Sequence, residues 1–199
     1  MADNLNDLPK DLKKSLRSAA LTQRDALPPD IRIEKSLAIC DHGAGLEIEP
    51  GSIVSGFWPM RSEADIRPLM AALGERGARL CLPAIIDRET IVFRELVRGA
   101  ALVEMGFGTH GPGPEAEELD PELMLMPLAA FDGKGNRIGY GGGFYDRAIE
   151  RLRAAGRAPQ LIGIAFACQE TDAAPAEPHD VGLDAILTED GLRSFTGGT

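Results

Sequence analysis

The residues best suited to chemistry lie in one glycine-rich stretch, from Gly135 to Asp146. We expect a loop there, between a buried strand and a helix, which is where α/β proteins bind ligands. Glycines let a backbone approach an anion closely, and the amides that begin the next helix point at that anion. Lys134 and Arg137 add positive charge, and an arginine can bind two phosphate oxygens at once. The stretch predicts a loop that binds nucleotide phosphates, through Gly139, Gly141, Gly142 and Gly143.

Asp146 is predicted to fall in the first turn of that helix, close to the phosphates. A carboxylate there repels phosphates unless a cation lies between them, and Mg²⁺ is commonly bound by carboxylates together with phosphate oxygens. Loop and carboxylate together predict a magnesium–nucleotide site. The alternative is a flexible turn in which Asp146 only favours the helix dipole. The stretch is neither a Walker A motif nor GxGxxG, but its density of glycines, cations and aromatic residues favours the functional interpretation.

Three further groups of residues could contribute to such a site. Lys13, Arg17 and Arg24 recur on one face of the first predicted helix, where Lys13 and Arg17 could reach the phosphates. The alternative for these cations is a solvated helix face. Trp58, the only tryptophan, and Glu63 could bind a planar, nitrogen-rich heterocycle by stacking and hydrogen bonding.

Structural alternatives exist for the other candidates too. Trp58 could belong to the core, with Glu63 at the start of a helix. Asp180 is a candidate second cation ligand, and its alternative is a turn-forming aspartate. We find no Ser/His/Asp order or Cys/His pairing that would indicate nucleophilic catalysis.

Composition narrows the function classes. The 199 residues carry 21 Lys+Arg against 31 Asp+Glu, a net charge of −10, which argues against non-specific nucleic-acid binding. Cys40, Cys81 and Cys168 are too far apart for a zinc site and are expected to be reduced, mostly buried thiols. No apolar stretch reaches the length of a membrane span or resembles a signal peptide, so a cytoplasmic protein is expected.

Hydrophobic periodicity and turn residues predict the elements that position these groups. Strands alternating with helices indicate one α/β domain over residues 1–199, with a largely parallel sheet flanked by helices. Residues 106–120 are expected to be a loop, and residues 1–7 and 196–199 to be frayed. Asp65 is expected to cap the third helix, and Gly77 to end it. The predicted helices are 9–26, 30–40, 66–76 and 144–155, and the predicted strands are 53–58, 79–85, 90–96, 123–131, 160–167 and 184–187.

The chain resembles the 5-formyltetrahydrofolate cyclo-ligase family, also called 5,10-methenyltetrahydrofolate synthetase, over nearly its whole length. The resemblance implies a NagB/RpiA/CoA-transferase-like fold and an ATP- and Mg²⁺-dependent conversion of 5-formyltetrahydrofolate to 5,10-methenyltetrahydrofolate, with release of ADP and phosphate. The matching segments are the helix around Lys13 and Arg17, Trp58-Pro59 with Glu63, Met126-Pro127, residues 131–147, and His179-Asp180 with Asp184 and Thr188-Glu189.

The resemblance also implies roles for individual residues. Asp146 and Asp180 would bind magnesium. Trp58, Glu63 and Tyr145 would contact the folate, with Arg137 and Tyr145 as the catalytic residues. ATP would be contacted by Lys13, Arg17, Lys134, Arg137, Gly139, Gly141, Gly142, Gly143 and Tyr145. Ile138, Gly142 and Phe144 depart from the commonest family pattern, and the departure at Gly142 leaves the backbone contacts intact.

The implied chemistry requires no nucleophile from the protein. The formyl group is an amide and a poor electrophile, so ATP would phosphorylate its oxygen, and N10 would then attack the carbon and expel phosphate. The expected ligands are ATP and 5-formyltetrahydrofolate, with or without a polyglutamate tail, bound to a monomer that contacts neither nucleic acid nor membrane. Two alternatives remain: a sugar-phosphate isomerase or CoA-transferase relative that uses no ATP, and a non-catalytic protein that only binds nucleotide or a partner.

Overall fold

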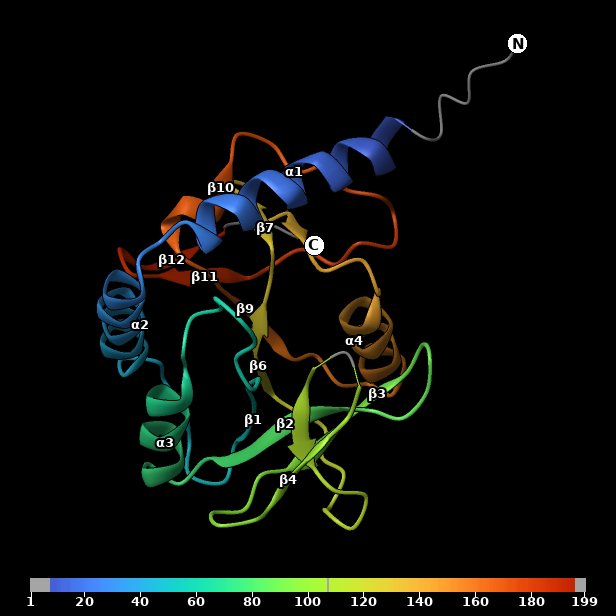
Figure 1. Ribbon diagram of the computed structural model, residues 1–199. Coiled ribbons are helices and arrows are strands. Elements are labelled where there is room, and N and C mark those ends of the chain that lie inside the picture. Colours follow the sequence, from blue (N-terminus) through green and yellow to red (C-terminus); the bar gives the residue numbers. More distant parts are fainter. Residues whose placement is uncertain (1–7, 107, 196–199) are drawn as a thin grey trace.

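A seven-stranded sheet forms the centre of the computed structural model, which describes residues 8–106 and 108–195 (Figure 1). The predicted frayed residues, 1–7 and 196–199, lie outside the described ones. The sheet has the order β12-β11-β9-β6-β1-β2-β3. β11, β9, β6, β1 and β2 run parallel, and the edge strands β12 and β3 are antiparallel to their neighbours. The strands are β1 Ile53–Ser55, β2 Arg79–Ile85, β3 Ile91–Glu95, β6 Leu123–Pro127, β9 Gln160–Ile164, β11 Ala185–Thr188 and β12 Gly191–Ser194. The predicted α/β class with a largely parallel sheet is confirmed.

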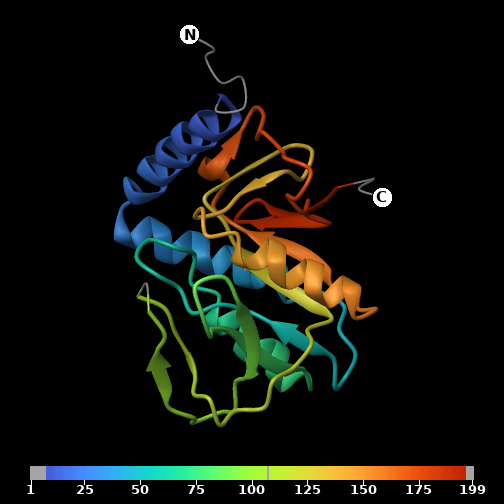
Figure 2. The ribbon, with the colours of Figure 1, turned by 90° about the vertical axis from the view of Figure 1, so that its right-hand side faces the viewer.

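Both faces of this sheet are buried, because helices cover each of them (Figure 2). Alternate residues of β6 belong to different cores: Leu125 packs with the residues of α2 (Pro29–Gly43) and α3 (Arg67–Glu75). Met124 packs with α4 (Phe144–Ala154) on the opposite face. Successive side chains of a strand point to opposite faces of the sheet. A strand buried on both faces therefore has apolar residues at every position, which explains the continuous apolar run of this segment.

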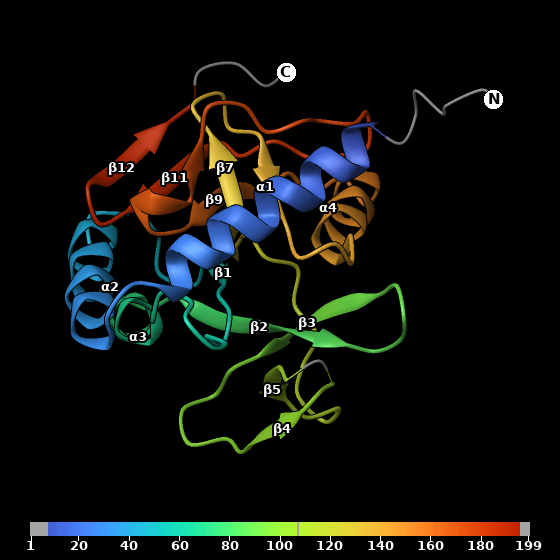
Figure 3. The same cartoon turned by 45° about the horizontal axis from the view of Figure 1, so that its top comes forward.

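The first helix, α1 (Leu8–Asp25), packs outside this arrangement. It contacts β7 (Ala130–Asp132), β10 (Glu170–Thr171) and the short helix η1 (Ala167–Gln169), and Figure 3 shows it crossing in front of them. Leu16 and Ala20 of α1 pack against Ala130 and Ile138 in a small apolar cluster. From this position Arg17 and Arg24 of α1 reach Gly139 and Tyr140, which follow β8 (Arg137–Ile138).

The predicted strand over 123–131 is wrong in its continuity. The chain leaves the large sheet after β6, and β7 joins a three-stranded sheet of order β10-β7-β8. Gln169 explains the break, because its Nε2 donates to the carbonyls of Leu128 at 2.9 Å and Ala129 at 3.0 Å, the two residues between the strands. A side-chain amide from a distant segment thus replaces the strand partner at this point.

The predicted loop over 106–120 is also wrong in part, because β5 (His110–Pro112) lies within it and pairs antiparallel with β4 (Leu102–Glu104). β1 ends earlier than predicted, at Ser55. Asp65 is not the N-cap of α3; Ile66 occupies that position, and Asp65 Oδ1 accepts from the Arg67 amide at 3.1 Å.

The predicted strand over 160–167 also ends early, at Ile164, and Ala167 begins η1, whereas the predicted helices and their glycine ends are confirmed. The four helices lie where the sequence predicts them, to within a few residues. Gly77 and Gly156 follow α3 and α4 with positive φ values of 96° and 77°, a conformation that favours glycine. Within the described part of the chain, no helix combines the length and apolarity needed to cross a membrane.

Candidate functional site

The predicted site residues lie beyond the carboxyl ends of the parallel strands. Segment 56–66 follows β1, and β7, β8 and the glycines follow β6. Since parallel strands end at the same edge of a sheet, the two segments leave the sheet side by side. The arrangement therefore brings the predicted nucleotide residues and the predicted folate residues to one edge.

The stretch predicted as a single loop, Gly135–Asp146, is two structures separated by β8. Lys134 lies in the β7–β8 turn, where its amide donates to Asp132 Oδ1 at 2.9 Å and its side chain is exposed. The glycines begin at the other end of β8. The structure therefore does not bring Lys134 together with the other predicted ATP ligands, and its role stays a prediction.

Residues 139–143 form the loop that enters α4. Gly141 and Gly143 have positive φ values of 98° and 64°, and a Cβ at Gly143 would lie 2.6 Å from Arg147 Nη1. Two arginines bind the carbonyls of this loop: Arg17 Nε donates to Gly139 O at 2.7 Å, and Arg147 Nη2 donates to Gly142 O at 2.8 Å.

The amides of the same loop are available to a ligand. Among the described residues, none of the N–H groups of residues 139–143 has a hydrogen-bond partner. An array of unpaired amides at the start of a helix, beside arginines, is a set of donors suited to an anion. The loop therefore fits the phosphates of a nucleotide.

Arg137 and Asp146 form an ion pair beside the loop. Arg137 Nη2 donates to Asp146 Oδ1 at 2.7 Å, and the Arg137 side chain is only 6% exposed. Arg137 Nη1 is buried with no hydrogen-bond partner among the described residues. Asp146 lies in the first turn of α4, as predicted, and its Oδ1 also accepts from the Val181 amide at 3.1 Å. A predicted phosphate ligand is thus paired with a predicted cation ligand.

Lys13 and Asp180 form the same kind of pair. Lys13 Nζ lies 2.5 Å from Asp180 Oδ2 and 2.6 Å from Glu177 Oε2. Burial opposes the charge of Lys13, but the hydrogen bonds to the two carboxylates prevail and raise the pKa of its ammonium. For Asp180, burial is likewise outweighed, by the bonds from Lys13 and the Glu177 amide, which lower the pKa of its carboxyl group.

The loop of Asp180 also connects the two predicted magnesium ligands. Val181, whose amide binds Asp146, directly follows Asp180. Glu177, His179 and Asp180 place potential ligand atoms within 4.8 Å of one another. The two carboxylate oxygens are of the type that a hard divalent cation prefers, whereas His179 offers a ring nitrogen, and Lys13 occupies both carboxylates in this structure.

Trp58 and Glu63 lie on the segment after β1. Trp58 packs against the core on the α2 and α3 side, and the Arg67 guanidinium lies 5.2 Å from the centroid of its ring. The rest of Trp58 lines a cavity of about 630 Å³, together with Pro59, Met60, Arg61, Gly108 and His110. Trp58 is therefore both a core contact and a cavity wall.

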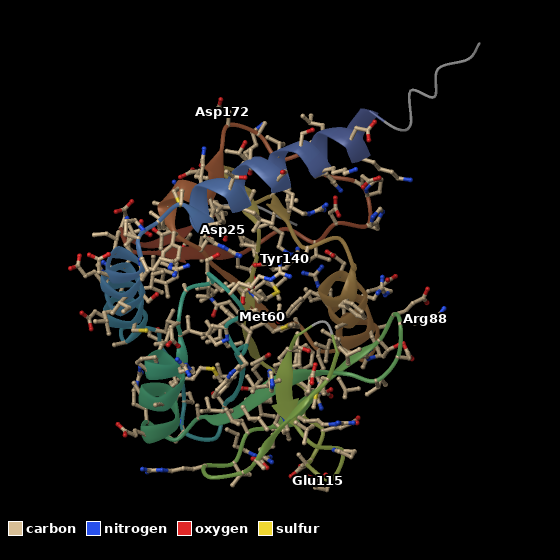
Figure 4. All side chains as sticks on the ribbon, viewed as in Figure 1. Asp25, Met60, Arg88, Glu115, Tyr140 and Asp172 are labelled. Atoms are coloured by element: carbon tan, nitrogen blue, oxygen red, sulfur yellow. The ribbon has the colours of Figure 1, made fainter. Side chains whose placement is uncertain are left out.

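The carboxylate of Glu63 accepts two hydrogen bonds. Its Oε2 accepts from the Met60 amide at 2.8 Å, and its Oε1 accepts from the Tyr140 hydroxyl at 2.5 Å. Burial raises the pKa of the Glu63 carboxyl group, although both bonds and the charges of Arg24 and Arg61 oppose the rise. In Figure 4 the side chains of Met60 and Tyr140 lie close together near the middle of the molecule.

Tyr145 lies between the two groups of predicted ligands. Its hydroxyl is buried and has no hydrogen-bond partner among the described residues. Burial and the charge of Glu63 raise the pKa of the Tyr145 hydroxyl, whereas the charge of Arg137 opposes the rise. The hydroxyl is thus protonated at neutral pH and free to donate one hydrogen bond.

Arg24 is the functional residue that sequence reasoning undervalued. It is 3% exposed, its Nε donates to Ser62 Oγ at 2.9 Å, and its Nη1 donates to the Tyr140 hydroxyl at 2.7 Å. The solvated helix face considered for Lys13, Arg17 and Arg24 is therefore wrong. The sequence feature that could have indicated the position of Arg24 is its spacing of seven residues from Arg17, which places both side chains on one face of a helix.

A second cavity, of about 440 Å³, lies at the opposite edge of the sheet, where β1, β2 and β6 begin. Two of its arginines are paired with neighbouring acids, Arg79 with Glu95 and Glu117 and Arg157 with Asp120, and Arg151 donates to the carbonyl of Ile91. It contains none of the predicted site residues, so the glycine-loop edge remains the candidate site.

Comparison with known proteins identifies the family that shares this arrangement. The sequence model of the 5-formyltetrahydrofolate cyclo-ligase family matches residues 9–189. The chain belongs to this family. The 5-formyltetrahydrofolate cyclo-ligase of Mycolicibacterium smegmatis is 33% identical over 184 residues, which cover 88% of this chain and 93% of the relative.

Solved structures of similar proteins agree with the fold. The structure of Aquifex aeolicus 5,10-methenyltetrahydrofolate synthetase superposes with a TM-score of 0.79 at 27% identity, and covers 94% of this chain and 95% of its own. A 5,10-methenyltetrahydrofolate synthetase from Mycoplasma pneumoniae gives a TM-score of 0.72 at 25% identity, with 89% and 98% covered.

Proposed function

We propose that this chain is a 5-formyltetrahydrofolate cyclo-ligase, which uses ATP to convert 5-formyltetrahydrofolate to 5,10-methenyltetrahydrofolate. Membership of the family over residues 9–189 supports the activity. The observation that carries the proposal is the loop of residues 139–143. Its carbonyls are bound by Arg17 and Arg147, its amides are unpaired among the described residues, and Arg137 Nη1 lies unpaired beside it.

The phosphates of ATP are proposed to bind these donors. The loop amides and Arg137 Nη1 would each bind a phosphate oxygen, and for Arg137 Nη1 this removes the cost of leaving a buried donor unsatisfied. The γ-phosphate transfers to the formyl oxygen, and ADP leaves. N10 then attacks the activated carbon and gives up its proton to solvent, and the bond to the phosphorylated oxygen breaks to release phosphate. Catalysis here depends on positioning and charge stabilisation, without a covalent bond to the protein.

The two ion pairs support a proposal for how a magnesium ion would bind. Phosphate oxygens would compete with these carboxylates for the two basic side chains. If Arg137 turned toward the phosphates it would release Asp146, and if Lys13 did so it would release Asp180. Carboxylates and phosphate oxygens together are the ligands that Mg²⁺ prefers. The ion would neutralise charge on the phosphates. Nucleotide and cation are therefore expected to bind together better than either alone.

The folate is proposed to bind between the loop and the cavity lined by Trp58. The Glu63 carboxylate would accept hydrogen bonds from ring N–H groups, and Trp58 would contact the ring. The unpaired Tyr145 hydroxyl lies near both Glu63 and Arg137, so it can donate to an oxygen at the junction of the two ligands.

One assay tests the proposal. The protein is mixed with 5-formyltetrahydrofolate, Mg²⁺ and ATP, and the near-ultraviolet absorbance of the methenyl product is followed. We expect product to form, to require ATP, and to stop when a chelator removes the cation. A folded protein that gives no product would refute the proposal, and turnover without ATP would favour an isomerase-like or transferase-like enzyme.

A variant tests the metal ligand separately. Asp146→Ala is expected to reduce turnover severely while the protein stays folded, and near-normal turnover would remove Asp146 from the metal site. The monomeric state, the cytoplasmic location and the polyglutamate preference stay predictions. Size-exclusion chromatography tests the monomer.

A further inference from the structure

Tyr140 belongs to the loop of residues 139–143, but its side chain leaves that loop. Its hydroxyl donates to Glu63 Oε1 at 2.5 Å and accepts from Arg24 Nη1 at 2.7 Å. Tyr140 as a residue is 43% exposed, so it contributes little to the core. A single hydroxyl therefore connects the loop proposed to bind the nucleotide with Glu63, the residue proposed to bind the folate.

Arg24 decides the direction of these bonds. An arginine can only donate, so the Tyr140 oxygen must accept from Arg24, and its one proton is then directed at Glu63. Arg24 is itself held in place, because it is 3% exposed and its Nε donates to Ser62 Oγ. Ser62 in turn donates to Asp25 Oδ1. The hydroxyl is thus oriented by groups of α1 and of the segment that carries Glu63.

The Tyr140 proton affects both the orientation and the charge of Glu63. The groups that face this carboxylate are Tyr140, the Met60 amide, Arg24 and Arg61, and Tyr145 lies near enough to sense its charge. Burial raises the pKa of Glu63, and the Tyr140 bond is the largest of the effects that oppose it. Loss of the hydroxyl would therefore leave a carboxylate that is less fixed and more easily protonated.

We propose that Tyr140 is a positioning residue that couples the two ligands: a nucleotide bound to residues 139–143 fixes Tyr140, which fixes Glu63 for the folate. The glycines on either side of Tyr140 restrict its backbone little, so phosphates bound to the loop amides would add to the restraint that its hydroxyl bonds to Arg24 and Glu63 provide. Ordering that is completed by the first ligand need not be repeated for the second, so each ligand strengthens binding of the other by the same factor. This inference rests on the proposed function.

Tyr140→Phe tests the coupling, because it removes the hydroxyl and keeps the ring. Calorimetry measures the Kd of 5-formyltetrahydrofolate with and without Mg²⁺ and a non-hydrolysable ATP analogue. In the wild type we expect the analogue to tighten folate binding by about fivefold or more. In Tyr140→Phe this factor should fall close to one, while the Kd of the analogue alone changes less than about twofold. The KM for folate should rise about tenfold, since a bond to a charged group is lost, with a smaller change in kcat.

The pH dependence separates this role from a general structural one. Glu63 binds folate as a carboxylate, so binding weakens as the pH falls through its pKa. Because the variant raises that pKa, its folate affinity should begin to fall at a higher pH than in the wild type. General damage to the site would weaken binding equally at every pH. Thr22→Val is the control: it removes an exposed hydroxyl of α1 whose one side-chain hydrogen bond within the described part of the chain is to Ser18 O, and should change nothing.

Several results would overturn the inference. They are an unchanged coupling factor in Tyr140→Phe, no coupling in the wild type, and equal weakening of folate and analogue. In the Glu63→Gln background, Tyr140→Phe should have little further effect on folate binding, and a full additional loss would also contradict it. A wild-type protein that neither binds folate nor forms product would instead refute the proposed function.

Discussion

The ion pair between Arg137 and Asp146 allows a quantitative test of how this site is held together. Asp146→Asn keeps the shape of the side chain and removes its charge. Arg137 is 6% exposed and its Nη1 already lacks a partner among the described residues, so the substitution leaves a buried guanidinium without a counter-charge. The perturbation therefore acts on the stability of the site as well as on any cation it binds.

The structure sets the expected magnitude. Breaking a buried ion pair by removing one partner costs about 3–5 kcal/mol. Asp146 is 25% exposed, and an asparagine oxygen can still accept from Arg137, so we expect a cost below that range, of about 2 kcal/mol. In a chain of this length, each kcal/mol lowers Tm by about 2–4 °C, so Tm should fall by about 4–8 °C.

Urea unfolding followed by circular dichroism, without ligands, measures this change. Asp65→Asn is a matched control, because Asp65 and Arg67 form an ion pair that is 37% and 53% exposed, and its loss should cost less than about 1 kcal/mol. Adding Arg137→Met to Asp146→Asn should recover part of the lost stability. The reasoning is refuted if Asp146→Asn is no more damaging than Asp65→Asn, or if the two substitutions at the pair are additive.

Two further predictions concern the segments around the loop. Gly141→Ala should lower the free energy of unfolding by about 1 kcal/mol, because φ is 98° there, whereas Gly139→Ala, with open space at its Cβ, should not; equal effects in urea unfolding would contradict this. Asp132 accepts from the amides of Lys134 and Ala174, and these bonds, with those from Asn136, outweigh burial and lower the pKa of its carboxyl group. Its stabilisation is therefore fully present above the unfolded pKa of about 3.9 and is lost as the pH falls from there through the lower pKa of the folded state. Asp132→Asn should destabilise at pH 7 and much less at pH 3, and an equal cost at both would refute the assignment.

Sequence reasoning succeeded where structure depends on near neighbours in the chain. Helix ends at Gly77 and Gly156, the extent of β2, and the place of Asp146 in the first turn of α4 all follow from residues a few positions apart. Two-sided burial of the parallel strands could be read from continuous apolar runs such as the one in β6. The class of fold and the location of the glycine loop were therefore predictable.

The hydrogen-bond and ion-pair partners of the site residues were not predictable from the sequence. Lys13 and Asp180 are 167 positions apart, and Arg24 reaches Tyr140 across 116. The division between β6 and β7 requires the Gln169 amide, and β4 and β5 are too short to show a period of two.

The sequence by itself determined a parallel α/β sheet and a glycine loop followed by a helix that carries Asp146 in its first turn. It determined these because helical and strand periodicity and glycine conformations act locally. Only the tertiary structure decided that each predicted cation ligand is paired with a basic residue, and that Tyr140 bonds to Glu63. Such pairings depend on which segments pack together when the chain closes, and no local pattern encodes them.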